Sequence, residues 1–295
     1  MSTPTVDRPA ATSVPRDYVA PRPGALSRAV RWVRDHLIGI AAVLALIYLF
    51  LPIAVVVIFS FNKPEGRQNV AWNQFSLDAW LNICRDPTIC ESVGVSLQIA
   101  LISTAIATLL GTLISFALVR HKFRGRTATN LLIFLPMASP EIVMGSSLLA
   151  LFVAAGFGGQ LGFWTILIAH VMFCLSFVVV TVRSRLAGMD DVLEQAAADL
   201  YATPQQTFWR VTFPLVFPGI LGAALLSFSL SFDDFIVTNL NAGTTTTFPM
   251  YVWGVAQRGV PMQVNAVGTL MFLISVTIVV VGEVNSRRRA KALAG

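Results

Sequence analysis

The stretch EQAAADLYATPQQTFWRVTFPLVFPGI, Glu194–Ile220, connects two long apolar runs, and its local signals predict two short helices. Asp191 together with Glu194 has the form of a capping box that opens the first helix. The second helix opens with an N-cap, a proline at N1 and a glutamine at N3, which are Thr203, Pro204 and Gln206. Pro214 is expected to end this second helix, because a proline lacks the backbone N–H of a helix interior.

The first predicted helix carries an apolar face that contains both small and branched side chains. Its members are Val192, Leu193, Ala196, Ala197 and Leu200. Alanines let a partner approach closely, and an apolar helix face presented by a helix–turn–helix suits a partner's groove. The connection at 183–214 is therefore predicted to be a docking element that projects from the rest of the chain.

The rest of the chain is too apolar for an ordinary soluble domain. Of its 295 residues, 55% are hydrophobic and only 12% are charged, and the mean hydropathy is +0.71. A helix needs about 20 apolar residues to cross a bilayer. Six runs reach that length: Leu37–Phe61, Val93–Val119, Leu131–Val153, Leu161–Val182, Leu215–Leu240 and Val264–Val284. The sequence predicts an all-α integral membrane protein with six transmembrane helices between residues 37 and 284.

Basic residues predict the orientation of these spans, because Lys and Arg are retained on the cytoplasmic side. Seventeen of the 21 fall in four segments, which are residues 1–36, Arg120–Arg126, Arg183–Arg210 and 285–295. The other four lie in the alternate connections: Lys63, Arg67, Arg85 and Arg258. Both basic tails are therefore expected to be cytoplasmic, the first one mostly disordered. Anionic lipid headgroups account for the excess of positive charge, so no nucleic-acid partner is expected.

Acidic residues inside the spans are expected to mark a pathway. The third run is interrupted by Pro136 and Pro140, and Glu141 follows directly. Prolines free carbonyls that are tolerated only against protein or a water-lined cavity, and a buried carboxylate is costly, so Glu141 is expected to point inward.

The fifth run carries a polar stripe at helical spacing, made of Ser227, Ser231, Asp234, Thr238 and Asn241. These positions are expected to share one face of a continuous helix. Asp233 is turned about 100° from Asp234 by the helical period. No Lys or Arg lies within any span to neutralise the pair. The alternative to a pathway role is a structural pair bonded to nearby hydroxyls or backbone groups.

The loop Asn62–Ser92 between the first two spans contains AWNQFSLDAW, whose spacing suits a short helix in the outer interface. Trp80 in this stretch is either an anchor at headgroup depth or a π face beside a cation pathway. Cys84 and Cys90 share the loop, and either a disulfide or two free thiols is compatible with this place. The three cysteines form no CxxC and no Cys/His cluster at metal spacing, so no structural metal is expected.

The stretch Glu194–Ile220 resembles the cytoplasmic EAA signature of binding-protein-dependent ABC importer permeases. Ala196, Ala197, Val211 and Pro214 match that signature, and the run D-L-x-A-T-P from Asp199 agrees with it. Gln195 stands where the family's Glu usually is, with Glu194 one step out of register, and Tyr201 stands where its Gly is. The resemblance implies a fold like that of type I ABC importer permeases. It also implies an ATPase-coupling set of Glu194, Gln195, Ala196, Ala197, Asp199, Tyr201 and Pro214.

From the outer loop to the C-terminus the chain resembles polyamine-type (spermidine/putrescine) permeases. The matching segments are Ser139–Met144, Gln160–Trp164, Phe177–Leu186, Leu226–Asp234 and Val264–Leu270. The resemblance implies a small cationic substrate and a substrate pathway made of Trp80, Glu141, Ser231, Asp233 and Asp234. It also implies a multi-pass protein of the bacterial inner membrane.

No GxxxxGK[ST] motif occurs in the chain, so no cofactor is expected in it, and ATP and Mg are expected on separate subunits. The implied complex contains a second permease, most simply a homologue, two ATPase subunits and an extracytoplasmic binding protein. The chain is expected to carry no catalytic residue and not to be an enzyme.

Three other functions make different demands on the sequence. An anion importer should place Lys or Arg at membrane depth, which this sequence does not do. A permease for ferric ion or another small solute could use carboxylates and stays open. An intramembrane protease would need GxGD, HExxH or a Ser/His pair, whereas His170 in the fourth run is expected to be an interhelical hydrogen-bonding residue.

Overall fold

The computed structural model describes residues 25–66, 68–190 and 192–294, so the predictions for residues 1–24 and for Asp191 lie outside the described residues. The chain divides into two compact units, Met1–Val55 and Val56–Gly295. Helix α1 (Ala25–Phe59) supplies the described part of the first unit, and its large apolar side chains, such as Leu44 and Leu49, are exposed. An apolar helix with an exposed surface requires a lipid or protein environment.

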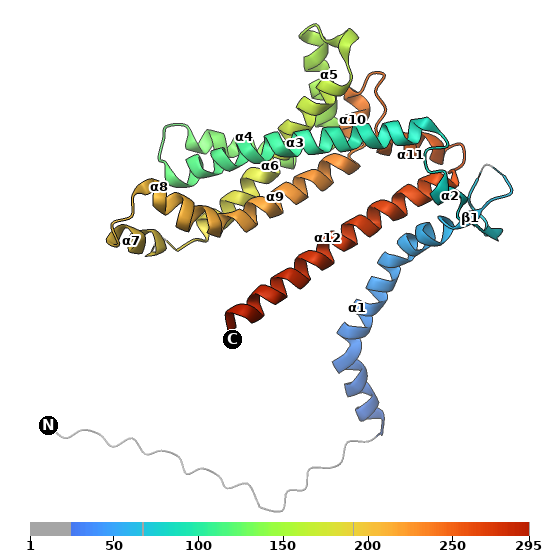
Figure 1. Cartoon of the computed structure of the whole chain (residues 1–295), viewed down its shortest axis with the longest axis horizontal. Helices are drawn as coiled ribbons and strands as arrows, with labels where there is room; N and C mark the ends of the chain where they lie inside the picture. Colours follow the sequence, from blue (N-terminus) through green and yellow to red (C-terminus); the bar gives the residue numbers. More distant parts are fainter. Residues whose placement is uncertain (1–24, 67, 191, 295) are drawn as a thin grey trace, which may run out of the picture. The chain divides into compact units, whose positions relative to one another are not determined.

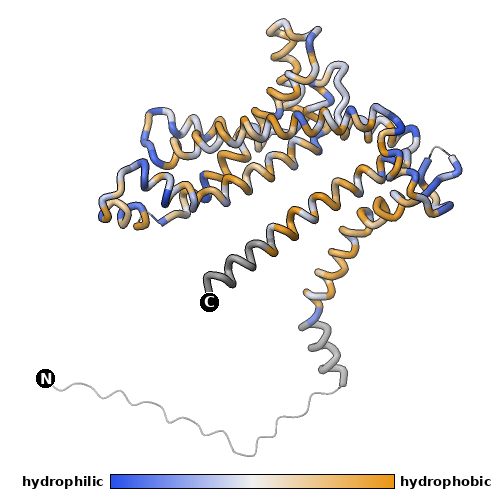
Figure 2. Tube along the Cα trace, viewed as in Figure 1, coloured by the Kyte–Doolittle hydropathy of each residue, from blue (hydrophilic) through white to orange (hydrophobic). Residues whose placement is uncertain are grey.

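The second unit is almost wholly helical (Figure 1). Its elements in chain order are β1 (Asn62–Lys63), β2 (Gln74–Phe75), α2 (Asp78–Leu81), α3 (Pro87–Arg120), α4 (Arg126–Ala138), α5 (Glu141–Ala154), the 3-10 turn η1 (Gly158–Gln160), α6 (Phe163–Ala187), α7 (Val192–Asp199), α8 (Pro204–Thr207), the π turn η2 (Phe208–Thr212), α9 (Phe213–Asp233), α10 (Ile236–Asn241), α11 (Phe248–Ala256) and α12 (Met262–Ala294). This confirms the predicted all-α class. Figure 2 shows that apolar residues dominate the long helices and that hydrophilic residues gather in the connections.

Five helices among the described residues are long and apolar enough to cross a membrane. The pair α4 and α5 adds a sixth span if the two are counted together, and their axes differ by 110°. The predicted interruption of the third run is therefore confirmed. The break lies at Ser139, which is extended (ψ 137°) because it precedes Pro140, whereas Pro136 lies inside α4.

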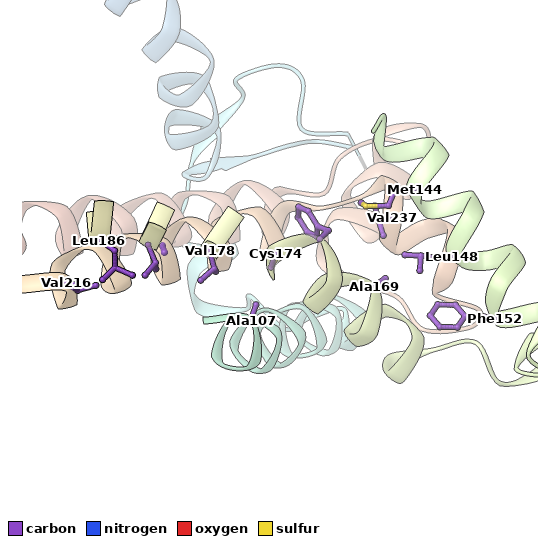
Figure 3. Packing of buried hydrophobic residues seen from close by; sticks show 13 residues of the cluster. Ala107, Met144, Leu148, Phe152, Ala169, Cys174, Val178, Leu186, Val216 and Val237 are labelled. Carbon is purple, nitrogen blue, oxygen red and sulfur yellow. The ribbon is translucent and has the colours of Figure 1, made fainter. Parts of the chain in front are cut away.

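The core of the second unit forms where α3, α6 and α9 pack side by side (Figure 1). Ala107, Cys174, Val178 and Val216 are among its fully buried members (Figure 3). A side chain at Gly111 would collide with Val178, since a Cβ there would lie 2.6 Å from its Cγ1. The small residue thus permits the close approach of α3 to α6.

The predicted continuous helix in the fifth run is wrong, because α9 ends at Asp233 and α10 begins at Ile236. Asp234 between them is extended, with ψ 125°. The polar residues predicted to share one helix face are therefore divided between two helices. In this conformation Asp234 Oδ2 accepts two hydrogen bonds from Thr238, which offset the lost helical bonds.

Pro214 does not end a helix, contrary to the prediction. One helix runs from Pro204 to Asp233, and the π turn at Phe208–Thr212 precedes the proline. The N–H of Phe213 reaches back to the carbonyl of Phe208, a five-residue step. Widening the helix before Pro214 lets the chain continue without the hydrogen bond that proline cannot donate.

The predicted short helix in AWNQFSLDAW is also largely wrong. Only Asp78–Leu81 is helical, and Gln74–Phe75 instead pairs antiparallel with Asn62–Lys63. Buried Asn62 organises this hairpin: its Nδ2 donates to the carbonyl of Ala71 at 2.7 Å and its Oδ1 accepts from the N–H of Asn73 at 2.9 Å. A satisfied buried amide outweighs the weak preference of this stretch for helix.

Candidate functional site

A cavity of about 690 Å³ contains all three acidic residues that the sequence predicted for the pathway, Glu141, Asp233 and Asp234. They come from two helix ends, since Glu141 begins α5 and Asp233 ends α9. Aromatic side chains complete much of the wall: Phe173, Phe232, Phe235, Phe248 and Trp253. The cavity therefore combines negative charge with π faces, a composition that suits an organic cation.

The formal charges decide the sign of the cavity. Backbone carbonyls at the end of α9 carry partial negative charge beside Asp233 and Asp234, but the starts of α5, α10 and α11 also line the cavity and carry partial positive charge. Asp233 is exposed at the end of α9, and Glu141 is exposed at the start of α5. The side chains that bear formal charge in the cavity wall are all acidic. A cation is thus the complementary ligand.

Asp234 is held more firmly than its neighbours. Its Oδ2 accepts hydrogen bonds from the backbone N–H and from the hydroxyl of Thr238, both at 2.8 Å. The Nε2 atom of His170 lies 3.5 Å from the same oxygen. The Asp234 side chain is only 6% exposed, so its partners set its orientation.

His170 is a buried interhelical hydrogen-bonding residue, as the sequence predicted. Its Nδ1 lies 2.7 Å from Ser231 Oγ and its Nε2 lies 2.9 Å from Thr238 Oγ1. The sequence did not indicate its proximity to Asp234, because the two residues are 64 positions apart and only the fold brings them together.

The other predicted pathway residues do not line this cavity. Ser231 is buried behind it, against His170 and Ser103. Trp80 stacks on Phe61 with ring centroids 5.5 Å apart and lines a separate hollow beside Cys84. The structure thus brings together three of the five predicted residues, and Ser231 is linked to Asp234 through His170 and Thr238.

The outer loop is closed by a disulfide between Cys84 and Cys90. It ties Cys84 to Cys90 in the first turn of α3, whose N-cap Asp86 accepts from the N–H of Thr88 at 3.0 Å. The hydroxyl of Tyr251 in α11 donates to the other Asp86 oxygen at 2.9 Å. That hydrogen bond, more than any other interaction, lowers the pKa of the Asp86 carboxyl.

The residues predicted to couple to the ATPase lie near the end of α3 and the start of α9 (Figure 1). Glu194 to Asp199 belong to α7, Tyr201 lies in the turn after it, and Pro214 lies in the first turn of α9. The capping box predicted for Asp191 and Glu194 lies outside the described residues. Glu194 Oε1 accepts from Arg120 at the end of α3 and from the Thr212 hydroxyl at 2.6 Å. The helix that carries the signature is therefore tied to both α3 and the start of α9.

The predicted apolar face of α7 is not buried within this chain. Val192 and Leu193 are 58% and 47% exposed, and Leu200 is 81% exposed.

Thr203 and Gln206 do form the predicted capping box at the start of α8. Tyr201, where the family signature has Gly, adopts a positive φ of 58°.

Among the described residues no group of three His, Cys, Asp or Glu side chains is arranged to hold a metal ion. Thr104, Thr108 and Thr112, one turn apart on α3, have buried hydroxyl oxygens with no hydrogen-bond partner in the part of the chain that the structure describes.

Comparison with known proteins identifies the family. Residues 107–289 match the family described as binding-protein-dependent transport system inner membrane component. The spermidine/putrescine transport system permease protein PotC of Haemophilus influenzae is 37% identical over 242 residues, covering 82% of this chain and 93% of that protein. The putrescine transport system permease protein PotI of Escherichia coli K12 is 37% identical over 230 residues, covering 76% and 81%.

Solved structures share the fold at much lower identity. A bacterial ABC transporter involved in the import of the acidic polysaccharide alginate has a chain that is 14% identical with a TM-score of 0.64, covering 88% of this chain and 99% of that chain. A chain of the MetNI methionine ABC transporter in an inward-facing conformation is 14% identical with a TM-score of 0.54, covering 67% and 94%.

The family match over residues 107–289 and the similarity to PotC show that this protein belongs to the family of binding-protein-dependent transport system inner membrane components. These are the multi-pass permease subunits of ABC importers, which work with a further permease, ATPases and a substrate-binding protein.

Proposed function

We propose that this chain carries polyamines, of the spermidine and putrescine type, through the membrane as one permease subunit of an ATP-driven importer. The observation that carries the proposal is the convergence of Glu141, Asp233 and Asp234 on one aromatic-lined cavity. The names of its relatives, PotC and PotI, point to the same substrates.

The cavity suits an elongated cation with several charges. Two carboxylates are exposed in it and a third is held by Thr238, so separate amines can be bound at separate places. Aromatic rings offer π faces and apolar surface to the methylene segments between the amines. Several weak sites favour passage, because a single tight site would hold the substrate.

A ferric-ion importer remains the second candidate, since carboxylates also bind a hard metal cation. The aromatic walls favour the polyamine, because π faces and apolar surface offer ferric ion no ligand atoms, whereas they pack against an alkyl chain.

The complex is proposed to contain a second, homologous permease, two ATPase subunits and an extracytoplasmic binding protein, in contact with membrane lipid. The exposed apolar face of α7 would fit a groove on an ATPase. The bonds of Glu194 to Arg120 and Thr212 would pass the motion of that face to α3 and α9.

The proposed domain organisation is a cytoplasmic basic tail at 1–36, a permease domain at 37–284 that includes the coupling connection 183–214, and a second cytoplasmic tail at 285–295. The excess of Lys and Arg in these segments supports it. Tags at residues 1 and 295 should resist protease added outside intact cells. Cleavage of either tag from outside would contradict this orientation.

Uptake of radiolabelled spermidine by the assembled complex in vesicles tests the substrate. Unlabelled putrescine should compete, and ferric citrate and sulfate should not. Competition by ferric citrate without competition by putrescine would favour the second candidate and contradict the polyamine proposal.

A further inference from the structure

A chain of buried polar side chains runs from the interior of the bundle to the cavity. Ser103 Oγ lies 3.0 Å from Ser231 Oγ, which lies 2.7 Å from His170 Nδ1. On the other side of the ring, His170 Nε2 lies 2.9 Å from Thr238 Oγ1, which donates to Asp234 Oδ2 at 2.8 Å. The chain joins α3, α9, α6 and α10 in that order and ends at the carboxylate in the cavity wall.

Counting protons fixes the state of the ring atom nearest the cavity. An ionised carboxylate only accepts, so the single hydroxyl proton of Thr238 is used in the bond to Asp234. Thr238 Oγ1 must then accept from His170, which requires a hydrogen on Nε2. The ring consequently donates toward the cavity, and Ser231 meets it at Nδ1.

The same ring bridges the break between α9 and α10. Ser231 belongs to α9 and Thr238 to α10, and His170 contacts both from α6. The far end of α10 is held separately, because Asn241 Nδ2 donates to the carbonyl of Gly145 in α5 at 3.2 Å. His170 is 1% exposed, so it acts as a fixed point between the two helices.

We propose that His170 is a positioning residue for transport, which sets the direction of α10 and, through Thr238, the orientation of Asp234 toward the cation. This inference rests on the proposed function of the cavity and adds a residue that does not itself line it. The N–H of His170 Nε2 is the group that positions Thr238 and, through it, Asp234. A substitution that keeps a donor at this place should therefore preserve transport better than one that removes it.

Two substitutions separate the two sides of the ring. His170→Gln can place an amide N–H near the position of Nε2, whereas His170→Asn reaches only toward Nδ1. Thr238→Val removes the hydroxyl that lies between the ring and Asp234 while keeping the shape of the side chain. The matched control is Thr165→Val, because the buried Thr165 hydroxyl also joins α6 to α10, at the carbonyl of Asn241, without lining the cavity.

The experiment measures KM and maximal rate of spermidine uptake in the assembled complex, after co-purification shows parent amounts of each subunit. His170→Asn and Thr238→Val should each raise KM roughly tenfold, as expected when a hydrogen bond to a charged group is lost. His170→Gln should raise KM by less than about threefold, and Thr165→Val should leave it at the parent value. Should His170→Asn fail to assemble, Thr238→Val carries the same test.

A second readout needs no substrate. Ile236 begins α10 and lines the cavity, so a cysteine placed there reports the position of this helix by its rate of alkylation. His170→Asn should change that rate by at least about threefold and Thr165→Val should not, because only the former frees the start of α10. If the parent complex carries no polyamine, the proposed function fails, and alkylation still decides whether His170 positions α10. A parent KM or a parent alkylation rate in both His170→Asn and Thr238→Val overturns the inference.

Discussion

The backbone N–H of Ala202 donates a 3.0 Å hydrogen bond to the carbonyl of Ala197 across the end of α7, and Tyr201 lies between them at a φ of 58°. A second bond from the N–H of Tyr201 to the carbonyl of Ala198, at 2.9 Å, completes a Schellman motif. Glycine is the usual residue at this position of the motif, because side chains are strained in the left-handed region. The family's glycine therefore has a conformational reason here, and Tyr201 adopts its backbone conformation.

Tyr201→Gly should stabilise the turn by about 1 kcal/mol, because the left-handed strain is removed and a ring that is 95% exposed contributes little packing. Thermal unfolding of the assembled complex should shift upward, with ATPase binding retained. Tyr201→Ala is the matched control, since it removes the ring but keeps the strain and should give no gain. Equal stability of both variants would show that φ is not the cause.

Ala197→Arg should uncouple the ATPase from the membrane subunit. Ala197 lies beside Leu200 and Val211 around a small hollow of about 290 Å³, which a long charged side chain would overfill. Co-purification of the ATPase should be lost while the permease remains in the membrane fraction. Gln205→Arg adds the same side chain at an exposed position of α8 outside that hollow and should leave binding intact. Normal ATPase recovery with Ala197→Arg would remove the docking argument.

The bond between Cys84 and Cys90 should leave neither thiol open to alkylation in unreduced protein, as mass spectrometry would detect. Cys174 is free but buried and should react only after denaturation. Replacing Cys84 and Cys90 together by serine should destabilise the outer loop by about 2 kcal/mol in the chain-entropy model, because the closed loop is short. Alkylation of both outer cysteines without a reductant would contradict the prediction.

Acid should weaken the contact between α3 and α11 through Asp86. Its pKa is lowered from 3.8, chiefly by the hydrogen bond from Tyr251, so the contribution of the charged carboxyl is complete above 3.8 and is lost as pH falls through the lowered value. Tyr251→Phe removes the bond and should move this loss to higher pH. Thermal unfolding between about pH 6 and pH 3 would show it. Identical pH profiles for Tyr251→Phe and the parent would refute the role of this hydroxyl.

Patterns local in the sequence predicted the apolar helices, the break before Glu141 and the capping box at Thr203, because each depends on neighbouring residues. The break after Asp233 was not predicted. No proline or glycine lies there. Asp234 Oδ2 accepts from Thr238, four positions on, and His170, which is 61 positions from Ser231 and 68 from Thr238, bridges the two helices. Long-range partners override local helical preference at such a site.

The prediction of a helix in AWNQFSLDAW failed for the same reason, because the buried amide of Asn62 is satisfied by residues up to 12 positions away. The prediction that the helix ends at Pro214 failed for a different reason. The helix continues through a π turn, and no residue type in Phe208–Thr212 predicts such a turn. For the candidate site, the sequence predicted the three acidic residues, because a charge inside a span costs free energy. It did not predict the aromatic side chains that line the cavity, because only the fold brings them together.

Spermidine uptake by complexes carrying Glu141→Gln, Asp233→Asn or Asp234→Asn tests the central claim most directly. These substitutions remove charge with little change of size, and Asn at 234 keeps an oxygen for the Thr238 hydroxyl, so assembly and ATPase binding should be preserved. Asn62→Asp is the control, because it changes the charge at a buried position outside the cavity. It should act through folding alone, by lowering the amount of complex. Each neutral variant should lower the uptake rate at least tenfold, roughly the loss of one charge-assisted hydrogen bond to an amine. Uptake at the parent rate by all three would contradict the acidic pathway and leave these carboxylates a structural role.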